Sequence, residues 1–229
     1  DTLFSESILV EVLDRLPNEF PLWVLPTQAI GFSPEHLEFP GTLSLSGDLM
    51  LKMISEIGNQ LSQMGFQRLV LFNAHGGQIG LLQAAARELR VQCPSMAVLP
   101  CFLWSGVESL KDLIPNKEVE QGLHAALAET SLMLSFEEDL VSNKRPFDGE
   151  GFIVSEGNKI SAPSGWSLEG AAPCAWLTHE LSQSGVIGDS RGASCELGDQ
   201  LRQSLVDHWC ELFLNLMNSK WPPVDAKTN

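Results

Sequence analysis

The chain has 229 residues, of which 44% are hydrophobic and 19% charged, and these fractions are typical of a soluble globular protein rather than a disordered one. Its formal net charge of −15, from 29 acidic and 14 basic residues, argues against binding to the phosphate backbone of a nucleic acid. No apolar run approaches the roughly 20 residues that span a bilayer, so we expect no transmembrane helix and no membrane partner.

The five cysteines are scattered and include no C-x-x-C pair. This spacing favours reduced thiols over a disulfide framework, excludes a zinc ribbon and predicts a cytoplasmic location. The sequence opens on "DTLF", with neither an initiating Met nor a signal-peptide pattern. We therefore interpret it as a trimmed version of a longer chain.

The first third of the chain contains two helical patterns separated by irregular sequence. Apolar residues at helical intervals predict a helix over 2–16, and the following apolar run predicts a strand over 21–30 that Pro26 bends. Residues 31–47, rich in Gly, Pro and Ser, predict a long loop, and loops of this length in a domain are often functional. A second amphipathic helix is predicted over 48–64.

A strand–helix–strand pattern follows. The apolar run 68–72 predicts a strand buried on both faces, a helix is predicted over 79–91, and a second buried strand over 95–104. This alternation is typical of parallel strands joined by a right-handed crossover. The fold class predicted is α/β: a single three-layer α/β/α domain with a mainly parallel sheet, spanning residues 1–229.

The last part of the chain mixes helical and irregular patterns. Helices are predicted over 124–137 and 197–217, and the polar stretch 141–169 between them is predicted to be a surface excursion with little periodic structure. His179 and His208 lie in helical patterns beside Leu and Trp, and both are interpreted as structural.

The stretch "LVLFNAHGGQIG" (69–80) ends a predicted strand on His75, followed by Gly76 and Gly77. Ligands of an open parallel sheet bind beyond the carboxyl ends of its strands, where glycines let backbone N–H groups approach them. A histidine at this position is a good metal ligand or general base, but from these residues alone a histidine that only caps a turn is an equally good interpretation. The glycine spacing does not match a dinucleotide-binding loop.

The stretch "HAALAETS" (124–131) places His124 and Glu129 five residues apart, which is about 140° of rotation on an ideal helix. If both act at one site, His124 must lie in the loop before the helix and Glu129 in its first turns. Taken alone, this stretch favours a structural reading, with a histidine near a helix N-terminus and an exposed glutamate.

The loop "SPEHLEFPGT" (33–42) contains His36 and two glutamates, and functional and structural readings of it are about equal. Trp104 ends a predicted strand and is either half-buried or part of a pocket wall. No G-x-S-x-G elbow and no Cys–His signature indicates a serine or cysteine nucleophile.

Three stretches, in this order, resemble the creatininase (creatinine amidohydrolase) family: "FPGTLSLSGDLM", "GFQRLVLFNAHGGQ" and "HAALAETSLML". The segment "GVIGDSRGASCELG" resembles the family's sequence before its last helix. The resemblance implies an α/β/α fold, a two-metal amide-hydrolysing site and a homo-oligomer, often a hexamer. Zinc, manganese and iron are all compatible with mixed histidine and carboxylate ligands.

The resemblance also implies roles for individual residues. The family's early E-x-H-G motif and the strand before it would lie upstream of this chain, and Asp1 matches the Asp that bridges the metals. The metal ligands implied are therefore Asp1, His75 and Glu129, and the catalytic residues are His124 and Glu129. Substrate binding is predicted for Trp104, Gly76, Gly77 and His36.

The chain departs from the creatinine-hydrolysing members, which carry a Tyr and a Glu where Gly76 and Gly77 stand here. Creatinine itself is therefore a doubtful substrate, and the function predicted is metal-dependent hydrolysis of non-peptide amide C–N bonds in a small molecule, cyclic amides included. Related members deformylate a pyrimidine or cleave a peptide. Two alternatives remain: a catalytically degenerate binding or scaffold subunit, and a metal-free small-molecule-binding domain in which His75 is a turn residue.

Overall fold

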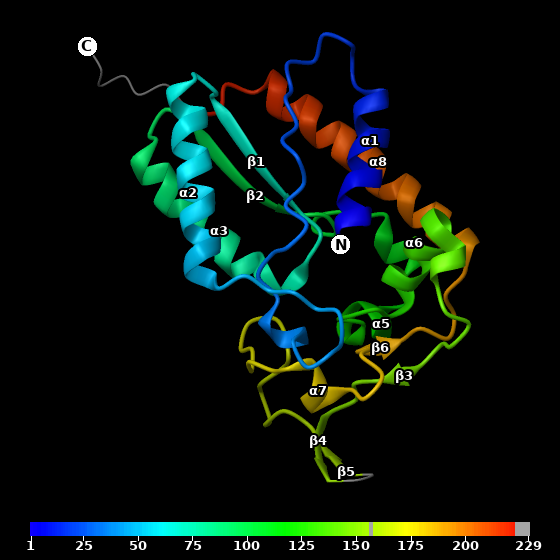
Figure 1. The fold of residues 1–229 in the computed structure, drawn as a ribbon. Helices are drawn as coiled ribbons and strands as arrows, with labels where there is room; N and C mark the ends of the chain where they lie inside the picture. The colour runs from blue at the N-terminus through cyan, green and yellow to red at the C-terminus, as the bar shows by residue number, and fades with distance from the viewer. Residues whose placement is uncertain (156–157, 223–229) are drawn as a thin grey trace. The chain divides into compact units, whose positions relative to one another are not determined.

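The predicted strand–helix–strand pattern is present in the computed structural model, which describes residues 1–155 and 158–222. Strands β1 (Arg68–Asn73) and β2 (Ala97–Phe102) pair in parallel, with Arg68 opposite Ala97 and Asn73 opposite Phe102. Helix α3 (Ile79–Gln92) connects them (Figure 1). The α/β fold class is thus confirmed.

The chain divides into two units. Unit 1 contains the described residues of Asp1–Ser33, Leu43–Val107 and Leu205–Asn229, and unit 2 contains Pro34–Thr42 and Glu108–Ser204. That residues 1–229 form a single domain stays a prediction. In the described part of the chain, no helix is both long enough and apolar enough to cross a membrane.

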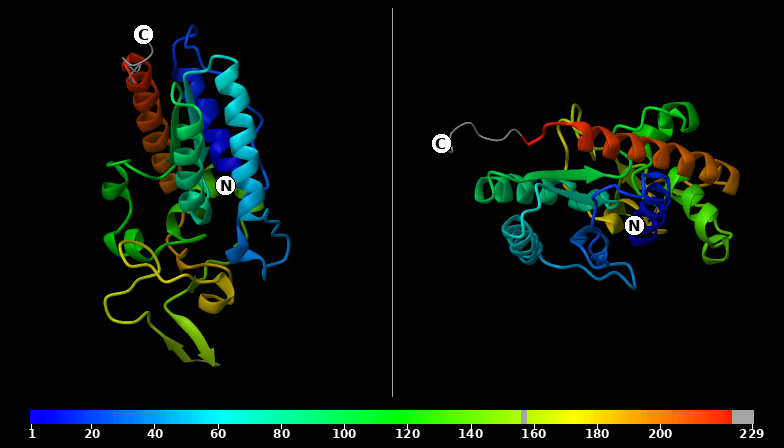
Figure 2. Two further views of the ribbon diagram at one scale, coloured as in Figure 1. Left: turned by 90° about the vertical axis from the view of Figure 1, so that its left-hand side faces the viewer. Right: turned by 90° about the horizontal axis from the view of Figure 1, so that it is seen from above.

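The pair β1–β2 is the middle layer of unit 1. Successive side chains of a strand point to opposite faces of the sheet, and other elements cover both faces. Leu69, Leu71 and Val98 face α2 (Gly47–Gln63) and α3, where they pack against a buried cluster. That cluster comprises Met50, Ile54, Leu82, Ala85, Leu89, Cys93 and Met96. On the other face, Phe72 packs edge-on against Trp209 of α8 (Cys195–Asn218), with 4.8 Å between ring centroids. Figure 2 shows the strands between α2 and α8.

Helix α1 (Thr2–Arg15) also belongs to unit 1 and agrees with the helix predicted over 2–16. It buries Phe4, Ile8 and Val12, which recur at helical intervals. At its end, Arg15 Nη1 lies 2.6 Å from the Asp207 carboxylate of α8. The helix begins at Thr2, so Asp1 stands at its N-cap position.

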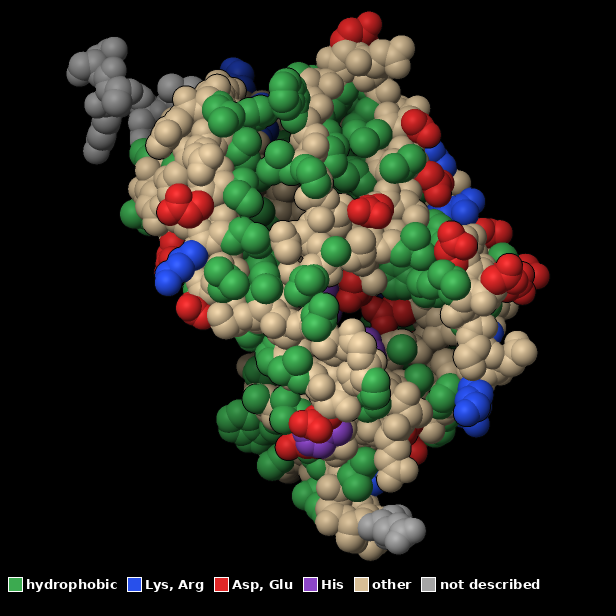
Figure 3. Space-filling model, viewed as in Figure 1, with side chains coloured by type: hydrophobic (Ala, Val, Ile, Leu, Met, Phe, Trp, Pro, Cys, Tyr) green, Lys and Arg blue, Asp and Glu red, His purple; other side chains and the backbone are tan. Residues whose placement is uncertain are grey.

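The strand predicted over 21–30 is wrong, because these residues form no strand. Pro21 and Pro26 lack the backbone N–H that a sheet ladder requires. Trp23 is 80% exposed and contacts only the edge of the Phe66 ring among described aromatic neighbours, at 5.9 Å between centroids. Figure 3 shows hydrophobic side chains gathered on the face in view. The exposed hydrophobic residues of unit 1 include Val24, Leu25, Leu43 and Leu49.

Unit 2 is built from short elements. The helical ones are η1 (Pro34–His36), α4 (Leu110–Leu113), α5 (Asn116–Gln121), α6 (Leu127–Glu137), η3 (Glu138–Leu140) and α7 (Thr178–Leu181). Antiparallel pairs join β3 (Phe147–Asp148) to β6 (Gly188–Asp189) and β4 (Phe152–Ser155) to β5 (Asn158–Ile160). The stretch predicted to carry little periodic structure, 141–169, therefore contains three short strands, and its residues 156–157 lie outside the described ones.

The first turn of α8 packs against α6 so closely that the contact requires glycine. A Cβ added at Gly198 would lie 2.0 Å from the carbonyl oxygen of Ser131. We expect Gly198→Ala to lower the free energy of unfolding by about 3 kcal/mol, because the backbones must move apart. Gly80→Ala in α3 is the matched control: a Cβ there meets no atom within 4 Å, so stability should stay unchanged or rise by up to about 1 kcal/mol. Equal urea midpoints for the two variants would contradict this expectation.

Candidate functional site

The loop that follows β1 in unit 1 is organised by Asn73, which is only 5% exposed. Its Oδ1 accepts hydrogen bonds from the backbone N–H of His75 at 2.9 Å and from Gln78 Nε2 at 2.8 Å. Its Nδ2 donates to the carbonyl of His75 at 2.7 Å. One buried side chain therefore fixes the backbone of His75 on both sides. Sequence reasoning missed this role of Asn73, although an Asn two residues before a strand-end His is a recognisable Asx-turn signal.

The side chains of Asp1 and His75, both predicted as metal ligands, meet within unit 1. His75 Nδ1 lies 3.3 Å from Asp1 Oδ2, and the imidazole is 13% exposed. Asp1 is the N-cap residue of α1, yet its side chain makes no capping hydrogen bond to that helix. Two ligands of a tetrahedral zinc ion lie about 3.4 Å apart, given bonds of about 2.1 Å. One carboxylate and one imidazole at this separation fit two ligand positions of a single divalent ion.

Gly76 and Trp104 lie in the same unit and were predicted to bind substrate. Gly76 begins the short helix η2 (Gly76–Gln78), and a Cβ there would meet no atom within 4 Å. Packing therefore does not require a glycine at position 76, which has room for a larger side chain. Trp104 follows β2, and its ring packs edge-on against Phe4 at 6.2 Å between centroids. Its buried Nε1 has no hydrogen-bond partner among the described residues, as expected of a donor reserved for a ligand or water.

In unit 2, His124 precedes a helix rather than beginning it, so the helix predicted over 124–137 starts three residues late, at Leu127. The backbone of His124 forms an isolated antiparallel bridge with Ile187, with N–H···O distances of 3.1 and 2.8 Å. Ala125 follows with a positive φ of 49°, which interrupts the helical path. The structure thus puts His124 in the preceding loop and Glu129 in the first turn of α6, which is the arrangement that their spacing requires if both act at one site.

Two carboxylates hold this loop against the N-terminus of α6. Glu129 Oε2 accepts the N–H of Ala125 at 2.6 Å, and Glu118 Oε1 accepts the N–H of Leu127 at 2.8 Å. Glu118 is 8% exposed, and this burial raises the pKa of its carboxyl group. Sequence reasoning missed Glu118, since a carboxylate nine residues before its partner follows no helical or strand period.

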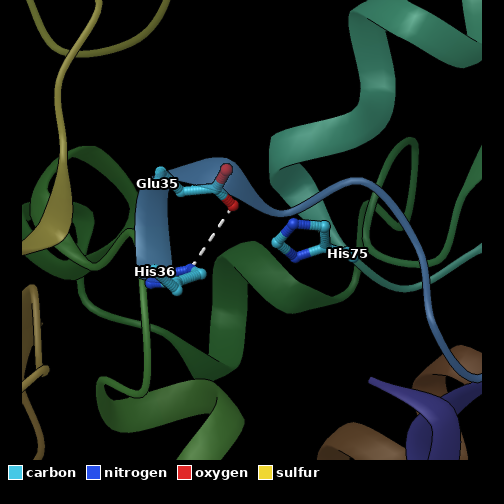
Figure 4. A group of neighbouring side chains, drawn as sticks. All are labelled: Glu35, His36 and His75. Carbon is cyan, nitrogen blue, oxygen red and sulfur yellow. Dashed lines mark ion pairs between the residues drawn. The ribbon is translucent and has the colours of Figure 1, made fainter. Parts of the chain in front are cut away.

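His36, also predicted to bind substrate, lies in unit 2 beside His124. The ring centroids of the two histidines are 4.1 Å apart and their planes are inclined by 33°. His36 Nδ1 is 2.6 Å from Thr178 Oγ1, and its Nε2 is 3.5 Å from Glu35 Oε1. Figure 4 draws the ion pair of Glu35 and His36 together with His75 of unit 1. These three side chains carry the oxygen and nitrogen atoms that divalent metals take as ligands.

The contacts of Asn73 make it a test of the metal site. We expect Asn73→Ala to weaken zinc binding by about 10- to 100-fold, because the backbone that aims the His75 imidazole loses two hydrogen bonds and the Gln78 side chain loses a third. Competition with a chromophoric chelator measures this affinity. Asn59→Ala in α2 removes comparable hydrogen bonds to Ser55 and Gln92 and should leave zinc affinity unchanged. Equal affinities for the two variants would exclude this role of Asn73.

The family model for creatininase (creatinine amidohydrolase) matches residues 1–213. A curated mycofactocin precursor peptide peptidase from Mycobacterium ulcerans is 27% identical over 215 residues, which cover 90% of this chain and 72% of the relative. A solved structure from Bacteroides fragilis superposes with a TM-score of 0.76 at 20% identity, covering 96% of this chain and 83% of that one. A creatininase structure named for manganese superposes with a TM-score of 0.68 at 22% identity, covering 96% and 84%.

Proposed function

The chain belongs to the creatininase family, and from this membership and the Asp1–His75 pair we propose that it is a metal-dependent hydrolase of amide C–N bonds. The observation that carries the proposal is the 3.3 Å separation of Asp1 Oδ2 and His75 Nδ1 at the carboxyl end of β1. Ligands of parallel sheets bind at such ends. The donor types are those that divalent metals take in hydrolases.

We propose that Asp1, His75 and Glu129 supply ligands to two divalent ions, zinc, manganese or iron. The manganese named for a solved creatininase supports this choice of metal. When bound, such an ion lowers the pKa of a water molecule and polarises the scissile carbonyl group. Asp1 contributes a carboxylate that is 42% exposed and so remains accessible from solvent.

We assign proton transfer to the departing nitrogen to His124 or Glu129. Glu129 also holds the loop that carries His124, through the N–H of Ala125. The backbone N–H groups of Gly76 and Gly77 are assigned to the developing oxyanion. The indole N–H of Trp104 is assigned to the substrate, since it is a buried donor without a partner among described residues.

The substrate class that we propose first is a non-peptide, cyclic amide in a small molecule. The family description, creatinine amidohydrolase, supports a cyclic amide, while Gly76 and Gly77 disfavour creatinine itself. A short peptide is the second candidate, because the curated relative from Mycobacterium ulcerans is named as a peptide peptidase.

The test is an assay of the purified protein after its metal has been removed and zinc or manganese added back. Creatinine, hydantoin, dihydrouracil and a set of short peptides are incubated with each form, and newly formed amines or carboxylates are measured. We expect metal-dependent hydrolysis of hydantoin or dihydrouracil, and little of creatinine. Hydrolysis of peptides alone would establish the second candidate. Metal binding without turnover of any compound would favour the degenerate binding or scaffold subunit and contradict the proposal.

A further inference from the structure

Gln78 joins two segments of unit 1 that are far apart in the sequence. Its Oε1 accepts a hydrogen bond from the backbone N–H of Phe32 at 3.1 Å, across 46 residues of the chain. Its Nε2 donates to Asn73 Oδ1 at 2.8 Å. The side chain of Gln78 therefore connects the backbone at Phe32 to the loop that carries His75.

The hydrogen bonds of this bridge run in one direction. A backbone N–H only donates, so Phe32 requires the oxygen of the Gln78 amide, and the nitrogen of that amide then faces Asn73. Asn73 must present Oδ1 to this nitrogen, which leaves Asn73 Nδ2 for the carbonyl of His75. The N–H of His75 donates to the same Oδ1 at 2.9 Å. In this orientation of the two amides, each contact pairs a donor with an acceptor.

The bridge needs a residue without a side chain at position 31. A Cβ added at Gly31 would lie 2.5 Å from Gln78 Oε1 and 3.3 Å from Gln78 Cδ. The backbone of Gly31 is held from another side, because its carbonyl accepts the N–H of Leu45 at 2.8 Å. A methyl group at position 31 would therefore displace the end of the Gln78 side chain and break its contact with Phe32.

We propose that Gln78 is a positioning residue of the metal site, which holds the main chain of His75 in place through Asn73. The imidazole of His75 has a contact of its own with Asp1, so the part on which Gln78 acts is the main chain. A main chain held at this point limits where the imidazole can lie when it binds a metal. This consequence for metal binding rests on the proposed function.

Amide hydrogen exchange of His75, followed by NMR, tests the bridge without substrate or metal. We expect Gln78→Ala to raise the exchange rate of the His75 N–H by about 10-fold, the equivalent of one hydrogen bond. Gln78→Glu should raise it further, because a carboxylate still accepts from Phe32 but turns an acceptor toward Asn73 Oδ1. A role in packing alone predicts the opposite order, since glutamate is as large as glutamine.

The helix after this loop provides two controls. Gln78 is the N-cap residue of α3, where a negative charge favours the helix, so faster exchange in Gln78→Glu would not reflect a weaker α3. Gln83→Ala removes an exposed glutamine from α3 and should leave the exchange rate of His75 unchanged. Unchanged exchange in both Gln78 variants, or a smaller effect of Gln78→Glu than of Gln78→Ala, would overturn the proposal.

Gly31→Ala breaks the bridge from its other end. We expect it to accelerate exchange of the His75 N–H as Gln78→Ala does, with little loss of stability, because the displaced group is the end of a flexible side chain. In the Gln78→Ala background, Gly31→Ala should add nothing, since the bridge is already absent. An equal increase in both backgrounds would overturn the proposal.

Zinc affinity then tests the consequence for the metal site. We expect Gln78→Glu to weaken zinc binding by about 10-fold or more, and Gln83→Ala to leave it unchanged. Unchanged affinity in Gln78→Glu would overturn the role of Gln78 at the metal site. If the wild type binds no zinc, the proposed function fails, while the exchange comparison still decides whether Gln78 positions the main chain of His75.

Discussion

Replacing His75 with Ala is expected to remove most of the bound metal and to lower kcat/KM by at least about 100-fold, since even partners that only orient a ligand contribute about 10- to 100-fold. The His75 side chain is largely buried, and its Nδ1 lies 3.3 Å from Asp1 Oδ2. The Asn73 side chain makes three hydrogen bonds within the loop that carries His75. The imidazole is therefore placed before any ion arrives. Metal content is measured by mass spectrometry of the purified protein, and activity on the amide that the wild type hydrolyses.

Two further variants sharpen this test. Asp1→Asn keeps an oxygen ligand but loses its charge, so metal affinity should fall less than in His75→Ala. His179→Ala removes an exposed histidine of unit 2 and should retain both metal and activity. Full metal occupancy in His75→Ala would contradict the assignment of His75, whatever its activity.

The largest effect on stability is expected at Asp148 of unit 2. Its two carboxylate oxygens accept hydrogen bonds from the backbone N–H groups of Gly149, Gln183 and Ser184. They also accept hydrogen bonds from the hydroxyls of Ser182 and Ser184. Lys159 Nζ lies 2.8 Å from Asp148 Oδ1. Asp148→Ala should lower the free energy of unfolding by about 3 kcal/mol or more, because these donors lose a charged acceptor. Asp139→Ala, at an exposed carboxylate of η3, is the control and should change stability little. Urea denaturation monitored by circular dichroism measures both.

The contribution of Asp148 should depend on pH with a defined sign. Burial alone would raise the pKa of this carboxyl group, but the Lys159 ammonium and the surrounding donors outweigh burial and hold its pKa well below the ordinary 3.8. The ionised form is thus stabilised by folding. Its contribution is complete above the unfolded-state pKa and is lost as the pH falls through the lower folded-state value.

Urea midpoints of wild type and Asp148→Asn should therefore differ by a constant amount above about pH 5 and converge in more acidic solution. A difference that grew on acidification would mean that the folded-state pKa of Asp148 is raised, contrary to its contacts. Asn is the appropriate replacement here because it retains the shape of the side chain without titrating.

The sequence predicts those features that depend on local periodicity. The helix over 2–16, the strand–helix–strand unit and the terminal helix all follow from apolar spacing, and the structure places each within a few residues of its expected bounds. The topology of parallel strands also explains why His75 falls at a ligand-binding edge. The strand predicted over 21–30 is wrong because apolar composition alone does not reveal that two prolines prevent pairing.

Contacts between distant segments could not be predicted. Thr178 joins His36 across 142 residues, and Ile187 fixes the backbone of His124 across the intervening chain, yet neither partner carries a local signal. The start of α6 was misplaced for this reason, since the bridge to Ile187 outweighs the helical preference of residues 124–126. The roles of the site residues, the homo-oligomer, the hexamer and the cytoplasmic location stay predictions.

The most direct test of metal-dependent hydrolysis is the metal content of the folded protein after equilibrium dialysis against zinc or manganese, read together with activity before and after chelation. The account predicts tightly bound divalent metal, loss of amide hydrolysis when a chelator removes it, and recovery when the metal is returned. A folded protein that binds essentially no metal, and gains no hydrolytic activity when zinc or manganese is supplied, would contradict it.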